Sequence, residues 1–195
     1  IIKIAFFSMC DHMEEWEANE NKHGIFYIQI NSNKMNSKQK EAIKLVEDLK
    51  SKNIVDFIVF SCHWNSNYVE KIDLAFKKFG RALIDAGVDI IHGHSPHHIL
   101  PVEKYNGGVI MYSLGGFVDD YALDKDFRND IGICVKFILE KGKNVSDNMK
   151  IIYHRINNLE MNQIKKKELL DDKKLTNIKG IRHTIEKLIR KKKII

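Results

Sequence analysis

The sequence lacks any hydrophobic run that approaches the roughly 18 apolar residues needed for a membrane-spanning helix. It has only three cysteines, Cys10, Cys62 and Cys134, and their wide spacing excludes both a disulfide framework and a paired-cysteine zinc motif. We find no internal repeat and no low-complexity linker. What remains is 195 residues with 44% hydrophobic and 30% charged side chains, which is typical of one globular domain with a sizeable core.

The sequence also lacks an initiator methionine. It opens directly on the strand-like run Ile1–Phe7. We therefore expect the chain to be the later part of a longer protein. A signal peptide or membrane anchor in such a protein would lie before Ile1, so localisation is left open at this stage.

A net positive charge is confined to the last 35 residues. The formal net charge is +6, but residues 161–195 carry 12 Lys and Arg against four acids, so the rest of the chain sums to −2. This basic segment fits an acidic partner or a solvated helix face. No aromatic residue follows Tyr153, and since base stacking needs aromatic side chains, we expect no nucleic-acid partner.

Hydrophobic periodicity predicts an α/β fold with a mixed sheet. Asn36 or Ser37 is placed to cap the first helix, and Gly87 to end the second in a left-handed turn. We predict a domain over residues 1–157 and a basic helical segment over residues 158–195 that packs on it or extends from it. The expected strands are 2–8, 25–30, 54–60, 89–91, 109–113, 131–140 and 149–155, and we expect 131–140 to pair with 149–155. The expected helices are 37–50, 69–86 and a charged helical stretch from Leu159. The final helix has an apolar face at Ile181, Ile185, Leu188 and Ile189.

Histidines gather at two predicted strand ends. The run Gly93-His94-Ser95-Pro96-His97-His98 follows one apolar strand, and His63 follows another. Strand ends are where α/β folds place ligands, and neutral imidazole is a common metal ligand near pH 7. If the two strands are neighbours, His63 can reach the same centre as His94 and His97. The alternative is that these are loop histidines that bond to the backbone. For His12, His23, His154 and His183 we expect solvated or structural roles.

Several segments, in this order, resemble the CapA family, named for capsule synthesis, within the metallophosphatase-like superfamily. The resemblance covers about residues 1–140, with a looser match over 149–188. The segments are Asp11–Ala18 with Gly24-Ile25, Cys62-His63-Trp64, Ala82–Gly87, Gly93–His98, Val102–Tyr105, Tyr112–Tyr121 and Arg128-Asn129-Asp130.

This resemblance implies part of a four-layer αββα sandwich with mixed sheets and a metal centre at strand ends. It carries over His63, His94 and His97 as ligands of a divalent metal (Mn, Fe or Zn), with His97 the firmest. Two departures stand out. Gly116 occupies a position where the family usually has Asn or Asp, and the family's early carboxylate motifs would precede Ile1.

The function that the resemblance implies is capsule or poly-γ-glutamate synthesis. One hypothesis is a metal-dependent, phosphoesterase-like hydrolase in which His98 protonates the leaving group. Glu103, Asp119 and Asp120 are candidates to orient the imidazoles, or are surface acids without a role.

The alternative hypothesis is a non-catalytic component that binds an acidic polymer or a capsule-synthesis protein. The family suggests the cell envelope, with membrane association only through a segment outside this chain.

Overall fold

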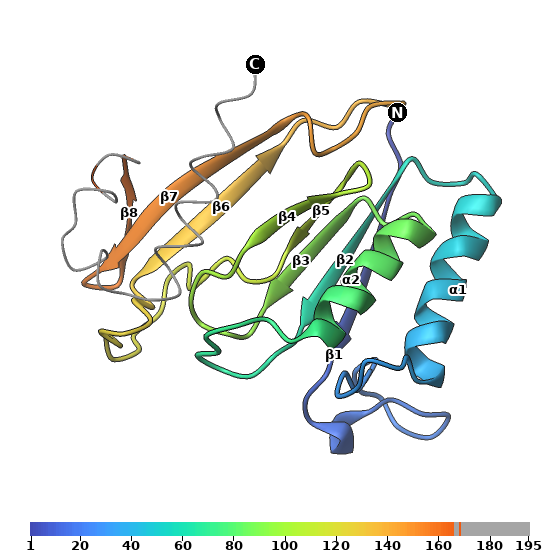
Figure 1. Cartoon of the computed structure of the whole chain (residues 1–195), viewed down its shortest axis with the longest axis horizontal. Coiled ribbons are helices and arrows are strands. Elements are labelled where there is room, and N and C mark those ends of the chain that lie inside the picture. The colour runs from blue at the N-terminus through green and yellow to red at the C-terminus, as the bar shows by residue number, and fades with distance from the viewer. Residues whose placement is uncertain (166–167, 169–195) are drawn as a thin grey trace.

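A five-stranded mixed sheet forms the centre of the molecule (Figure 1). The computed structural model describes residues 1–165 and 168. The strand order is β1-β2-β3-β5-β4, in which the first four strands are parallel and β4 runs antiparallel to β5. The strands are β1 (Ile4–Cys10), β2 (Phe57–His63), β3 (Ile90–His94), β4 (Val102–Tyr105) and β5 (Gly108–Met111).

Two helices, α1 (Ser37–Ser51) and α2 (Leu74–Ala86), cover one face of this sheet. Helix α1 begins where predicted, because the Asn36 side chain accepts from the Gln39 amide while Gln39 bonds back to the Asn36 amide. Helix α2 ends at Gly87, whose φ of +119° suits glycine. The core beneath them includes Val46, Phe60, Trp64, Phe76, Phe79, Leu83, Ile91, Ile110 and Tyr112.

A second, antiparallel sheet packs on the opposite face of the first. Its strands are β6 (Ile131–Phe137), β7 (Met149–Asn157) and β8 (Glu160–Ile164), in that order. Its side chains bury the alternate residues of β2, β3 and β5 in a core that includes Phe57, Ile90, Val109, Met111, Val135 and Phe137. The α/β class with a mixed sheet is therefore confirmed, and the described residues form helix, sheet and sheet layers, three of the four that we expected.

Some predicted elements differ from the structure. Residues 25–30 form only isolated bridges, and α2 begins at Leu74 because the Asp73 side chain caps it. Strand β4 was not predicted, and β8 stands where we expected helix from Leu159. The final helical face at Ile181, Ile185, Leu188 and Ile189 lies outside the described residues, and the domain boundary at residue 157 stays a prediction.

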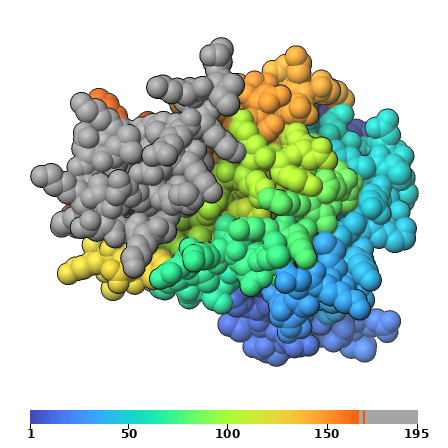
Figure 2. Space-filling model, viewed as in Figure 1, coloured from blue at the N-terminus to red at the C-terminus, as the bar shows by residue number. Residues whose placement is uncertain are grey.

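The segment 11–30 extends beyond the carboxyl end of β1. It contains the short 3-10 helix η1 (Glu14–Trp16) and projects from the body of the molecule below α1, in dark blue (Figure 2). It therefore lies at the edge of the sheet where the parallel strands end. Over residues 1–165 and 168, neither helix has the length and apolar character needed to cross a membrane.

Candidate metal centre

Three neighbouring parallel strands end on residues that can bind a metal. Cys10, His63 and His94 are the last residues of β1, β2 and β3, and the register pairs Cys10 with His63 and His63 with His94. Residues in register on parallel strands project from the same face of the sheet. The expectation that the strands bearing His63 and His94 are neighbours is thus confirmed, and the two rings lie edge to face with centroids 5.1 Å apart.

The tightest group of possible ligands is Cys10, His12 and His63, whose ligand atoms all lie within 4.8 Å of one another. The backbone holds this group in place. The Asp11 amide donates to the His63 carbonyl at 3.0 Å, which ties the turn after β1 to the end of β2. The His12 ring then packs edge to face on His63, with centroids 5.4 Å apart. We expected a solvated or structural role for His12, and that role stays a prediction, although the structure places its ring beside Cys10 and His63.

Asp11 supports the group from behind. Its side chain is only 7% exposed, and its Oδ2 accepts from the Asn65 amide at 2.9 Å. Its Oδ1 lies against Nδ1 of His12, and neither atom makes a hydrogen bond. Burial raises the pKa of the Asp11 carboxyl, while the Asn65 amide and the two neighbouring histidines oppose that rise. Asp11 is thus a buried carboxylate in direct contact with His12.

The neighbouring imidazoles are held neutral. Burial lowers the pKa of His94 to about 4, with His92 and His63 adding to the effect, and burial also lowers the pKa values of His92 and His63. Ser61 lies between two of the rings, with its Oγ 3.2 Å from Nδ1 of His92 and 3.3 Å from Nε2 of His94. At neutral pH these rings carry ring-nitrogen lone pairs rather than a positive charge, as metal binding requires.

The predicted ligand His97 lines the same pocket as His63 and His94 but stands on its rim. Its backbone is left-handed (φ +63°), and its ring lies against Tyr121, with centroids 5.0 Å apart. The tight ligand group in the described residues contains neither His94 nor His97. The triad of His63, His94 and His97 stays a prediction.

His98, the predicted general acid, lies behind the pocket wall. It is 3% exposed, and its two ring nitrogens contact the Pro96 and Val69 carbonyls at 2.9 and 3.0 Å. Burial lowers its pKa. Because both nitrogens are occupied by backbone oxygens, this arrangement favours a structural role, and the acid role stays a prediction.

The three predicted acidic partners lie away from the histidine rings. Glu103 is held by Arg81 (Nε at 2.9 Å) and by the Tyr112 hydroxyl at 2.9 Å. Asp119 and Asp120 line a separate hollow of about 380 Å³. Gly116 lies beside His154, whose Nε2 donates to its carbonyl at 2.9 Å.

The pocket in front of the centre has a volume of about 880 Å³. One wall is the apolar part of the segment 11–30, where Trp16 is 58% exposed. The lining residues include no Lys, Arg, Asp or Glu. They are Ser8, Met9, Cys10, His12, Met13, Trp16, Gly24, Ile25, Phe26, Ser61, His63, Asn67, His94, Ser95 and His97.

Sequence reasoning missed Cys10, Asp11 and His12 as site residues. We placed the end of the first strand at Ser8, two residues before its end in the structure, and so left Cys10 in a loop. The available signal was Cys10 and His12, two positions apart directly after an apolar strand, which matches the pattern that we used for His63.

Comparisons with known proteins identify the family of this chain. The family model for the bacterial capsule synthesis protein PGA_cap matches residues 1–121. A probable polyglutamine synthesis accessory protein of Mycobacterium tuberculosis is 26% identical over 181 residues, which cover 91% of this chain and 44% of the relative. The PGA biosynthesis protein CapA of Bacillus subtilis is 45% identical over 71 residues, 36% of this chain and 19% of that protein.

The capsule biosynthesis protein CapA of Bacillus anthracis is 40% identical over 78 residues, which cover 40% of this chain and 19% of that protein. The chain thus spans less than half the length of the curated relatives that it matches. The family model covers well over half of the chain, including both histidine-bearing strand ends. This chain belongs to the bacterial capsule synthesis protein family PGA_cap.

Proposed function

We propose that this chain carries the histidine part of a metal-dependent, phosphoesterase-like hydrolase that acts in the synthesis of a capsule polymer of the poly-γ-glutamate type. The observation that carries the proposal is the pair His63 and His94, which end neighbouring parallel strands with their rings 5.1 Å apart. Membership of the PGA_cap family supports the capsule context. The metal ligands in this proposal are His63, His94 and His97.

The donor set suits a divalent metal, because the rings of His63 and His94 have lowered pKa values and so offer lone pairs at neutral pH. When bound, such a metal supplies Lewis acidity and a nucleophile at neutral pH. The residues of this chain then have separate tasks. Ser61 fixes the orientation of His94 through its hydroxyl, and the Trp16 side of the pocket shields the centre from bulk water.

Two names among the relatives suggest the polymer: one is called a PGA biosynthesis protein, and another a polyglutamine synthesis accessory protein. We therefore propose an acidic polymer, or a capsule-synthesis protein that handles it, as the partner. The pocket lining contains neither Lys nor Arg, so in this proposal the metal supplies the positive charge that an acidic substrate needs.

The experiment combines metal analysis with two assays on the purified protein. Metal is determined by elemental analysis, and hydrolysis is measured with bis(p-nitrophenyl) phosphate and γ-glutamyl-p-nitroanilide. The variants are His63→Ala and His97→Ala, with His23→Ala as a matched control, because His23 is an exposed histidine outside the pocket. Stoichiometric metal, and hydrolysis that is lost in the first two variants but kept in the control, supports the proposal. Unchanged metal in His97→Ala overturns that ligand assignment.

One observation favours the second candidate, a binding or assembly component without catalysis. The residues that line the pocket include no carboxylate, so the side chains that they offer for acid or base catalysis are Cys10 and four histidines, three of which are the proposed metal ligands. Metal and poly-γ-glutamate binding without turnover of either substrate would support this function and overturn the hydrolase.

A further inference from the structure

We propose that Cys10, His12 and His63 form a thiolate-containing site for Zn²⁺. The inference deepens the proposed function, on which its relevance to hydrolysis rests. It adds two ligands, Cys10 and His12, that the histidine triad does not include, and it selects zinc among the metals that the sequence left open. It starts from the group of three ligand atoms within 4.8 Å of one another.

The geometry needs little adjustment to bind zinc. Bonds of about 2.0–2.3 Å in a tetrahedral arrangement place ligand atoms roughly 3.3–3.7 Å apart. Starting from separations of at most 4.8 Å, side-chain movements of about 1 Å are sufficient. Three protein ligands also leave a fourth position open toward the pocket, as in catalytic zinc sites.

The backbone positions Cys10 firmly before any metal binds. Its amide donates to the Phe26 carbonyl at 3.1 Å, and its carbonyl accepts from the Ile28 amide at 2.9 Å. Its Sγ accepts from the His12 amide at 3.4 Å, a contact that persists when the thiol becomes a thiolate. On binding, the thiol proton passes to solvent and the sulfur donates a lone pair to the metal.

Asp11 provides an independent observation that points to a metal at this place. Its side chain is more than nine-tenths buried, and its Oδ1 lies against Nδ1 of His12 without a hydrogen bond. Zinc-bound histidines almost always have their second nitrogen held by a carboxylate, a carbonyl or water. A buried carboxylate paired with His12 matches that arrangement.

The thiolate selects the metal class. Thiolate ligands favour zinc and other soft or borderline metals, whereas Mn²⁺ and Mg²⁺ favour carboxylate and carbonyl oxygens. Imidazole from His12 and His63 suits zinc equally well. Of the three metals that the sequence left open, this ligand group therefore favours zinc.

The first test replaces zinc by Co²⁺ in the purified protein, with a phosphine reductant to keep the thiols reduced. We expect a near-ultraviolet sulfur-to-cobalt charge-transfer band in the wild type. The band should disappear in Cys10→Ser and persist in Cys134→Ser, the matched control, because Cys134 is another half-buried free cysteine. In His12→Gln we expect zinc affinity to fall at least about 100-fold. A band that survives Cys10→Ser overturns the inference.

The second test uses the wild type alone, in case Cys10→Ser does not fold. Iodoacetamide labelling, followed by mass spectrometry, reports the reactivity of each of the three free cysteines. We expect Zn²⁺ to protect Cys10 and to leave the labelling of Cys134 unchanged. Labelling of Cys10 at the same rate with and without Zn²⁺ overturns the inference.

The outcome separates this inference from the proposed function. Zinc held by Cys10 without hydrolysis of either substrate supports the site and overturns the hydrolase. Hydrolysis with Mn²⁺ that survives Cys10→Ser supports the hydrolase and shows that hydrolysis does not need the Cys10 thiolate, whereas the cobalt band and the labelling of Cys10 decide the thiolate site itself.

Discussion

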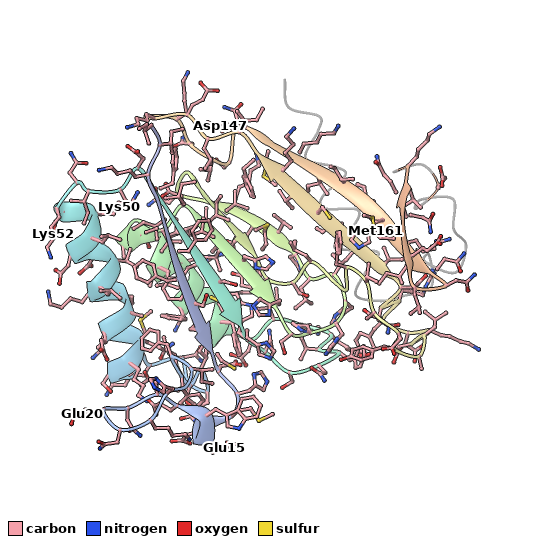
Figure 3. All side chains as sticks on the ribbon, turned by 180° about the vertical axis from the view of Figure 1, so that it is seen from behind. Glu15, Glu20, Lys50, Lys52, Asp147 and Met161 are labelled. Atoms are coloured by element: carbon pink, nitrogen blue, oxygen red, sulfur yellow. The ribbon has the colours of Figure 1, made fainter. Side chains whose placement is uncertain are left out.

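The two ends of the same parallel strands differ in chemistry. At the amino ends, charges are paired: Asp89 accepts from the Ile58 amide at 2.7 Å and from Lys50 at 3.0 Å, and Asp56 pairs with Lys141 at 2.8 Å. At the carboxyl ends, a thiol and neutral imidazoles face a pocket. Figure 3 shows the two ends of the molecule, with Lys50 at one end of α1 and Glu15 on the segment beyond the other.

This difference teaches how one sheet divides its tasks. Paired charges satisfy one another and fix the strands in place, so their removal should change stability. A thiol and neutral imidazoles that face a pocket contribute little to the free energy of unfolding, and their lone pairs are available to a metal. Substitutions at the two ends should therefore change different measurable quantities.

The largest expected effect is the loss of metal in His63→Ala. His63 belongs both to the proposed histidine triad and to the group that it forms with Cys10 and His12. Its removal should therefore lower metal affinity at least about 100-fold. The measurement is bound metal per chain by elemental analysis after dialysis. If His63→Ala retains metal at the wild-type stoichiometry, the carboxyl ends of the parallel strands do not bind the metal, and the proposed difference between the two ends is wrong.

His98→Ala should lower the free energy of unfolding by about 2–3 kcal/mol, because it removes the ring contacts to the Pro96 and Val69 carbonyls, of which Pro96 keeps the Tyr68 amide, and opens a small cavity. The measurement is urea unfolding, with bound metal and hydrolysis measured on the folded variant. His98→Gln is the companion, since its amide can restore one contact. A variant with wild-type stability and abolished hydrolysis would instead support the general-acid role.

Asp89→Asn should lower the free energy of unfolding by about 1–2 kcal/mol, since it weakens the bonds from the Ile58 amide and from Lys50 at a partly exposed site. Metal content should stay at the wild-type value. Chemical unfolding and elemental analysis of the same sample give both numbers. A loss of metal in this variant would show that the two ends are coupled.

The smallest expected effect is that of Trp16→Phe. Trp16 is 58% exposed on the pocket wall, so the free energy of unfolding should change by no more than about 0.5 kcal/mol. The other tryptophan, Trp64, is fully buried. Acrylamide should therefore quench the wild-type fluorescence strongly and that of the variant weakly. Equal quenching of the two proteins would show that the pocket wall is closed.

Local signals in the sequence predicted much of the fold. The cap at Asn36 and the stop at Gly87 depend on side chains and φ angles within a few residues, and the structure confirms both. Strand β8 was mistaken for helix, because its charged and polar sequence carries no clear alternation and its pairing with β7 is a tertiary contact.

The candidate site was only half predictable, for a related reason. His63 and His94 lie in apolar runs whose ends are visible in the sequence. Cys10 and His12 reach His63 only through the register of β1 on β2, which pairs residues 53 apart in the chain. No local pattern encodes that register, because it follows from packing across the whole sheet.

Strand β1 is the outermost strand of the first sheet, and beside its pairing with β2 it makes only one isolated bridge in the described residues, from Cys10 to Tyr27. Its outward face is also poorly covered, with Phe6 72% exposed. Such a strand opens more readily than the interior strands, and its amide hydrogens should exchange with solvent faster than those of β3. A metal bound by both Cys10 and His63 would hold β1 against β2. Metal binding should therefore slow hydrogen exchange along the whole of β1 and not only at the residues that bind the metal.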